Sequence, residues 1–193
     1  MTRAAMPERR FPPIDDASMT SAQRRVHDAI VSNRGGMGGP YPALLRVPEL
    51  AERVMAVGDA VRFENVLDGR RMELAIILTA RHWQAEFEWY AHSRLASKAG
   101  LPPSVLAAVA AGQRPAEDDT SAEPLDLAVY DFAVELLETG HVSDSAFSAL
   151  HSLVGDAGAV ALTATVGYYC LVSAVLNVDR VPAPPSDPPL PPR

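Results

Sequence analysis

The sequence has little of what thiol chemistry, nucleic-acid binding or membrane insertion requires. Cys170 is its one cysteine among 193 residues, so a single chain can form neither an internal disulfide nor a CxxC redox pair. Acidic residues outnumber lysine and arginine by 24 to 17, and the resulting net charge of −7 argues against a nucleic-acid partner. No run of about 18 apolar residues is free of polar breaks. The most apolar stretch, residues 157–178, holds two threonines, a serine and two tyrosines.

These deficits predict a cytoplasmic protein that binds neither a membrane nor nucleic acid. The N-terminus lacks the apolar core of a signal peptide, because Arg9, Arg10, Asp15 and Asp16 interrupt it early. A lone cysteine in an apolar stretch behaves as a small hydrophobic residue, so we expect a structural role for Cys170.

The spacing of apolar residues predicts helices along the chain and no strand, hence an all-α fold. Val26 and Ile30 mark a first helix at 20–33, with Thr20 or Ser21 as its N-cap. A second helix starts at Pro48, with Leu50, Val54, Val57 and Val61 expected on one apolar face. The other predicted helices cover 69–82 after an Asp68 cap, 84–99, 101–112, 124–139, 144–155 after a Ser143 cap, and the apolar stretch 157–178.

This pattern predicts one domain at residues 20–181, between an extended arm at 1–19 and a tail at 182–193. The tail has seven prolines in twelve residues and must be extended. The glycine-rich segment "NRGGMGGPYP" (33–42) predicts a flexible loop or a pocket lid, because no P-loop lysine follows it. An acidic run follows residue 114, and we expect it to be a solvated surface. Its members are Glu117, Asp118, Asp119, Glu123, Asp126 and Asp131.

The segment "HWQAEFEWYAHSR" (82–94) concentrates polar and aromatic side chains in this apolar chain. On a helix, Ala85, Glu88 and His92 share one face. A carboxylate one turn from an imidazole raises the proton affinity of the ring and fixes its orientation. Glu73, on the preceding predicted helix, would approach His92 if the two helices form a hairpin. The sequence alone leaves open whether these groups relay protons or form a surface pair, and a metal site lacks a third ligand.

Three segments of the chain resemble the carboxymuconolactone decarboxylase family, whose fold is shared with alkyl hydroperoxidase D. "RRMELAIILTARHWQAEFEWYAHSRLASKAGL" (70–101) resembles the core signature of that family. "LLRVPELAERV" (44–54) and "VGYYCLVSAVLNVDRVP" (166–182) resemble segments of its longer members. The resemblance implies an alkyl hydroperoxidase D-like helical bundle that associates through helix faces into trimers or hexamers.

The same resemblance implies roles for single residues. The hydroperoxidase branch uses a glutamate, a CxxC pair and a histidine. Glu73 matches the glutamate and His92 the histidine, whereas the cysteine positions fall on Ala85 and Glu88. Neither residue can form a thiolate or a disulfide, so we do not expect thiol peroxidase activity.

The decarboxylase branch also lacks the cysteine pair and works with acid–base groups. In its reaction a γ-carboxy-lactone loses CO2 and the resulting dienolate is protonated, without a cofactor, because the conjugated lactone carbonyl accepts the electrons. The resemblance then implies that His92 donates the proton, that Glu88 orients His92, and that Glu73 completes the relay.

Candidate substrate-binding residues surround this segment. Arg81 or Arg94 would bind a substrate carboxylate bidentately, and Trp83, Trp89 and Tyr168 are candidates for lining the pocket. Each of these side chains also suits a surface, core or interface position. We predict a homo-oligomeric lyase, free of metal and cofactor, that acts on a small carboxylated lactone or enolisable acid. Two alternatives stay open: a hydroperoxidase-like protein with little or no thiol activity, and a non-catalytic oligomeric ligand-binding protein.

Overall fold

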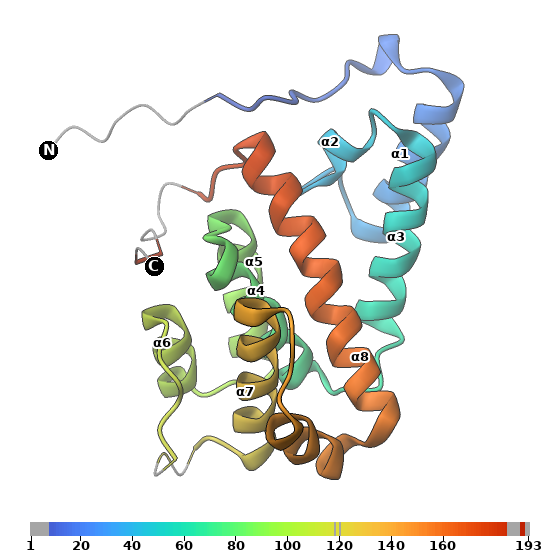
Figure 1. The fold of residues 1–193 in the computed structure, drawn as a ribbon. Coiled ribbons are helices and arrows are strands. Elements are labelled where there is room, and N and C mark those ends of the chain that lie inside the picture. Colours follow the sequence, from blue (N-terminus) through green and yellow to red (C-terminus); the bar gives the residue numbers. More distant parts are fainter. Residues whose placement is uncertain (1–7, 118, 120, 185–189, 192–193) are drawn as a thin grey trace, which may run out of the picture.

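The computed structural model is built from helices, and it describes residues 8–117, 119, 121–184 and 190–191 (Figure 1). Within this part of the chain there is no β-strand, which confirms the predicted all-α class. A 3-10 turn at Asp16–Ser18 precedes the helices. These are α1 (Ser21–Arg34), α2 (Tyr41–Leu44), α3 (Pro48–Phe63), α4 (Gly69–Trp83), α5 (Glu86–Lys98), α6 (Pro103–Ala111), α7 (Pro124–Thr139) and α8 (Asp144–Asp179).

The helices begin where the sequence places their caps. The side chains of Thr20, Asp68 and Ser143 each accept a hydrogen bond from a backbone N–H in the first turn of α1, α4 and α8. Such bonds satisfy backbone donors that have no partner within the helix. The predicted first helix and the helix after Asp68 are confirmed to within a residue or two.

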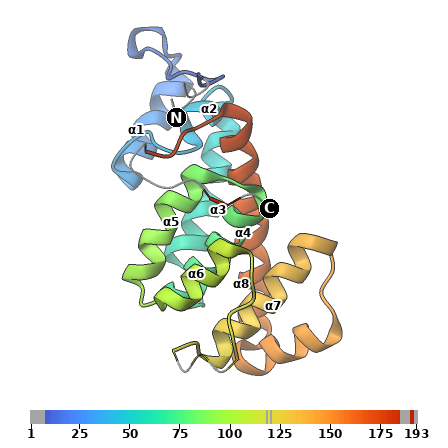
Figure 2. The same ribbon diagram turned by 90° about the vertical axis from the view of Figure 1, so that its left-hand side faces the viewer.

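Helix α4 is the central element of the fold. All its residues from Arg71 to Arg81 are buried, and it packs against α5, α6, α7 and α8. In Figure 1, helix α8 runs between α1–α3 on one side and α4–α7 on the other. Figure 2, a view from the side, shows α1 and α2 at one end of the molecule and α6 and α7 toward the other. Two apolar clusters result, one between α4, α6, α7 and the first part of α8. The other joins α1–α3 to the C-terminal part of α8.

Helix α8 contains a sharp break at Gly155, where φ is 65° and ψ is −171°. Such angles are essentially restricted to glycine, since a Cβ atom would clash there. The break separates the stretch 144–155 from the apolar stretch that follows, the same division that the sequence predicts.

Two expectations about which side chains are buried and which are exposed are wrong. Leu50 and Val57 of α3 are about half exposed, at 47% and 50%, while Val54 and Val61 are buried. The apolar face of α3 is therefore narrower than its sequence pattern indicates. Asp126, placed in a solvated acidic run, is fully buried because α7 packs it against α4. There it forms an ion pair with Arg70 and lies 3.3 Å from Arg71.

The described part of the N-terminal arm crosses the end of α8. Arg9 forms an ion pair with Asp179, whose carboxylate also accepts the N–H of Phe11 at 2.6 Å. Residues 1–7 of the predicted arm, and 185–189 and 192–193 of the proline-rich tail, lie outside the described residues. The division into arm, domain and tail stays a prediction.

Helix α8 is long and apolar enough to cross a membrane, judged by length and composition alone, and 44% of its most apolar window is buried inside the fold. A core helix of a soluble protein has the same character, and the cytoplasmic location stays a prediction. Exposed apolar side chains such as Val57, Phe63 and Val160 lie on α3 and α8. They are compatible with the expected homo-oligomer, which also stays a prediction.

Candidate active site

Glu73, Glu88 and His92 meet between α4 and α5. The two helices pack against each other, since the residue after α4, Gln84, has the left-handed conformation (φ 51°) and the chain turns back there. His92 Nδ1 lies 2.7 Å from Glu73 Oε2, and His92 Nε2 lies 3.0 Å from Glu88 Oε1. The hairpin geometry expected for Glu73 and the shared face of Glu88 and His92 are therefore present.

All three side chains of this triad (Glu73, His92 and Glu88) are buried, each 6% exposed or less. Burial by itself lowers the pKa of His92. The hydrogen bonds and negative charges of Glu73 and Glu88 outweigh burial and raise the pKa to about 9. Because carboxylates accept hydrogen bonds, both ring nitrogens donate and the ring is an imidazolium at neutral pH.

A cavity of about 210 Å³ opens onto one end of this triad. Glu88 and His92 line the cavity, and Glu73 does not. Its other walls come from the Gly-rich loop, α3, α5 and α8: Arg34, Gly36, Gly38, Gly39, Pro40, Tyr41, Arg62, Phe87, Ala91, Tyr168, Tyr169 and Val172. The Gly-rich loop thus borders a pocket, and its role as a lid stays a prediction.

Two tyrosines of α8 form the inner wall of the cavity. The ring of Tyr169 meets the His92 ring edge to face with centroids 5.1 Å apart, and Tyr168 packs against Tyr169 at 5.2 Å. Burial raises the pKa of both hydroxyls, so both tyrosines are neutral at ordinary pH. Tyr168 is the predicted substrate contact that the structure brings to the triad.

The other four predicted substrate contacts lie away from this cavity. The Arg81 Nε donates to the carbonyl of Ala110 at 2.9 Å, so the side chain stabilises the C-terminal end of α6. Arg94 is exposed and stacks on Tyr90, 3.8 Å from the ring centroid. Trp83 is 38% exposed, and Trp89 packs against the apolar cluster around α4 and α7.

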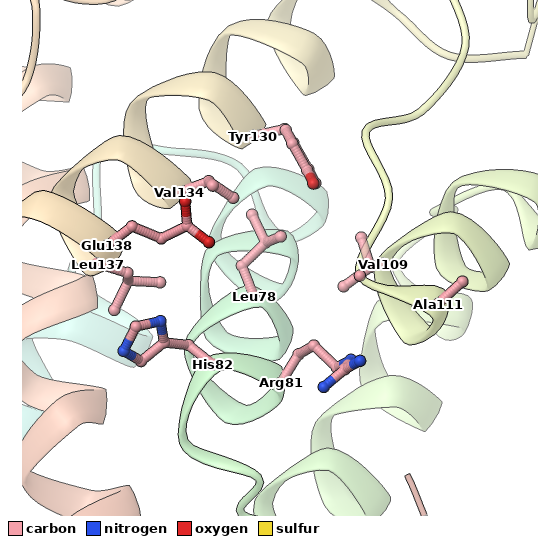
Figure 3. Close-up of a pocket in the computed structure, with 10 residues that line it drawn as sticks. Leu78, Arg81, His82, Val109, Ala111, Tyr130, Val134, Leu137 and Glu138 are labelled. Carbon is pink, nitrogen blue, oxygen red and sulfur yellow. The ribbon is translucent and has the colours of Figure 1, made fainter. Parts of the chain in front are cut away.

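Arg81 lines a second cavity, of about 310 Å³, between α4, α6 and α7 (Figure 3). In Figure 3 the Arg81 side chain points toward Ala111, whereas His82 and Glu138 lie on the other side of Leu78. The triad does not contribute to this cavity. In the described part of the chain, no group of three or more histidine, cysteine, aspartate or glutamate residues is arranged to hold a metal ion.

Sequence reasoning missed Arg34 and Arg62 as cavity residues. A signal was present in Gly58, a glycine inside α3, because such a residue marks a close approach of another element. A Cβ at Gly58 would lie 2.2 Å from the Tyr168 hydroxyl. Arg62 follows one helical turn later on the same face, where it reaches the cavity.

Comparisons with known proteins identify the fold. No family model matches the chain, and no curated protein matches it. Among solved structures, an uncharacterised peroxidase-related protein from Ralstonia eutropha with an alkylhydroperoxidase AhpD core has a TM-score of 0.76 at 21% identity. That match covers 94% of this chain and 95% of the other.

The chain has the AhpD-like fold.

Two further solved structures support this assignment. A peroxidase-related protein from a Silicibacter species gives a TM-score of 0.71 at 14% identity, over 93% of both chains. The debrominase Bmp8, in complex with 2,3,4-tribromopyrrole, gives 0.68 at 11% identity, over 87% of this chain and 88% of its own. The predicted fold is confirmed, and at these identities the likeness concerns the fold alone.

Proposed function

We propose that the chain is a cofactor-free acid–base enzyme that decarboxylates, or transfers a proton on, a small carboxylated lactone or enolisable acid. The observation that carries this proposal is the buried chain of Glu73, His92 and Glu88, which ends at a cavity. A buried imidazolium between two carboxylates is a proton store, and perturbed pKa values of this kind gather at catalytic sites.

The geometry favours Glu88 as the group that meets the substrate. Both nitrogens of His92 already face a carboxylate oxygen, so the ring has no free N–H to offer directly. Glu88 lines the cavity and can take a proton from His92 Nε2 and pass it on. In this scheme His92 stores the proton, Glu88 delivers it, and Glu73 holds the ring through Nδ1. The scheme differs from the sequence-based expectation, in which His92 is the direct donor.

In a decarboxylation the bond between the substrate carbon and its carboxylate breaks, and CO2 leaves. The electron pair of that bond moves into the conjugated lactone carbonyl and forms a dienolate. The proton that Glu88 receives from His92 then adds to the carbon of the dienolate. A proton from solvent restores the imidazolium, so one proton is consumed for each CO2 released. The low-dielectric walls of Phe87, Tyr168 and Tyr169 would favour loss of a desolvated carboxylate.

Thiol chemistry receives no support from this site. Glu88 and Ala85 stand where the resemblance expects cysteines, and Cys170 is not among the residues that line the cavity. Burial raises the pKa of the Cys170 thiol, although a hydrogen bond with Trp83 opposes this effect. A neutral thiol is a poor nucleophile, so thiol peroxidase turnover is not expected.

The proposal is tested by CO2 release from γ-carboxymuconolactone with the wild type, Glu88→Gln and Glu73→Gln. Removing a general acid costs about 10²- to 10⁴-fold in rate, so we expect Glu88→Gln to lose at least this much. The matched control is Glu86→Gln, an exposed glutamate two residues away on the same helix. Equal rates for Glu88→Gln and Glu86→Gln would contradict the proposed site.

A wild type that releases no CO2 calls for a second measurement, deuterium exchange from D2O into a panel of small enolisable acids. Exchange that depends on Glu88 would keep the acid–base function with another substrate. No exchange with any acid would instead favour the non-catalytic ligand-binding alternative.

A further inference from the structure

We propose that Arg62 binds a carboxylate of the substrate in the cavity lined by Glu88 and His92, and so selects small organic acids as ligands. The inference deepens the proposed function and rests on the same cavity. It moves the carboxylate-binding role from Arg81 and Arg94, which lie elsewhere, to a residue of α3.

The first argument is the state of the Arg62 side chain. It lies in the last turn of α3, is half-buried, and lines the cavity. Its Nε is buried and has no hydrogen-bond partner. Among the described residues, the contact of this guanidinium is a stack over the Phe63 ring at 5.6 Å, with no hydrogen bond or ion pair. Because a buried N–H without a partner is costly, an anion in the cavity that accepted a hydrogen bond from this Nε would be bound favourably.

The second argument comes from the neighbouring cation. Arg34 also lines the cavity and lies over the same Phe63 ring at 5.0 Å. Arg34 forms an ion pair with Asp59, which compensates its charge. Among the described residues Arg62 forms no such ion pair, so its guanidinium faces the cavity without a carboxylate in contact. A planar carboxylate fits a guanidinium through two parallel N–H···O bonds.

The third argument is the placement of Arg62 relative to the triad. Tyr169 packs against His92. Burial has the largest effect on the pKa of the Tyr169 hydroxyl and raises it; the charge of Glu88 raises it further, and the charge of Arg62 lowers it. The cationic and carboxylate ends of the cavity therefore face one small space. A cavity of about 210 Å³ lies below the usual range for drug-sized ligands, roughly 300–1,000 Å³. These features fit a small acid, bound by its carboxylate at Arg62 with its reacting carbon toward Glu88.

The test is an NMR titration with two probes of the same shape, adipate and its neutral diamide adipamide. The variants are Arg62→Gln and Arg62→Lys, with Arg53→Gln as the matched control, since Arg53 is an exposed arginine of the same helix. One charge-assisted, bidentate contact corresponds to about 10- to 100-fold in affinity. We expect Arg62→Gln to weaken adipate binding by this factor, Arg62→Lys to weaken it less, and Arg53→Gln to leave it unchanged. Adipamide should bind all four proteins alike.

Two results would overturn the assignment: a wild type that binds adipate no more tightly than adipamide, or equal adipate affinity in the Arg62→Gln and Arg53→Gln proteins. Circular dichroism establishes that the variants are folded, and Arg62→Lys keeps the positive charge at this position if the glutamine variant is unstable. Glu88→Gln separates this inference from the proposed function, because it should abolish turnover and retain adipate binding. Binding that depends on Arg62, without any Glu88-dependent turnover, would remove the proposed reaction and leave the carboxylate site.

Discussion

His92 shares its two ring protons with two carboxylates from different directions, one from α4 and one from its own helix. The hydrogen bond and the charge of each carboxylate raise the pKa of His92, and burial lowers it. Removal of either carboxylate therefore lowers this pKa. The charge state of this residue is therefore a property of the whole triad.

We expect the pKa of His92, about 9 in the wild type, to fall by at least about one unit in Glu88→Gln and in Glu73→Gln. The measurement is an NMR titration of the imidazole resonances between pH 5 and 10. Glu86→Gln is the control and should leave the titration unchanged, because Glu86 is exposed. A wild-type midpoint near the ordinary value of 6.5 would mean that the triad is not assembled as described.

At the residue scale the sequence predicted the triad and Tyr168, but not the arginines that line the cavity. Glu88 and His92 are one turn apart, and helical geometry alone places them on one face. Arg62 could not be found in the same way, since its position depends on how α3 meets α8, two elements separated by about half of the chain. Arg94 lies two residues from His92 on α5, yet on a helix of 3.6 residues per turn such side chains point to different faces. Arg81 lies on α4 and turns toward α6.

The close contact between α3 and α8 depends on a glycine, Gly58. Gly58 lets the Tyr168 hydroxyl approach the α3 backbone, and Tyr168 in turn forms part of the cavity wall. Any larger residue at position 58 must push this ring away.

We expect Gly58→Ala to destabilise the protein by about 1–3 kcal/mol, the usual cost of overpacking a core, and to weaken adipate binding. Gly167→Ala is the matched control, because Gly167 is an exposed helical glycine whose added Cβ would meet nothing within 4 Å. Alanine is the better helix former, so this control should stabilise by about 0.5–1 kcal/mol. Urea denaturation measures both changes, and a neutral or stabilising Gly58→Ala would contradict the close packing at Tyr168.

Element boundaries were the most predictable part of the fold, because caps are local. The N-cap residues Thr20, Asp68 and Ser143 mark the starts of their helices. The burial of Asp126 was not predictable, since its arginine partners lie more than 50 residues away in α4. A run of acidic residues therefore contained one that belongs to the interior.

At the scale of the whole molecule, the triad links stability to pH. The pKa of His92 is raised in the folded state, from the ordinary 6.5 to about 9, so the folded protein binds a proton more tightly than the unfolded chain. The resulting stabilisation is fully present below pH 6.5 and is lost as pH rises through about 9. The shift corresponds to at most about 3 kcal/mol.

We expect the free energy of unfolding to decrease between pH 6.5 and 9 by up to this amount, measured by urea denaturation at several pH values. His92→Gln carries no titratable ring and should lack this decrease. It should also be less stable at pH 6.5 by about 3–5 kcal/mol, because two buried carboxylates lose the cation between them. A wild-type stability that stays level over this range would contradict the raised pKa.

Asp179 joins two remote parts of the chain. Its carboxylate holds Arg9 and Phe11, and its carbonyl accepts the N–H of Arg10 at 3.1 Å. The backbone near residue 10 therefore lies beside the end of α8, and the described polypeptide nearly closes on itself as a ring. A short glycine linker from residue 181 to residue 8 would complete that ring, and new ends could be opened at the exposed residues Gly112 and Gln113 after α6. Such circular permutation is tolerated where chain ends are close and new termini are exposed. In the permuted protein the helices would follow one another along the chain in a new order, while their packing and the triad stay the same.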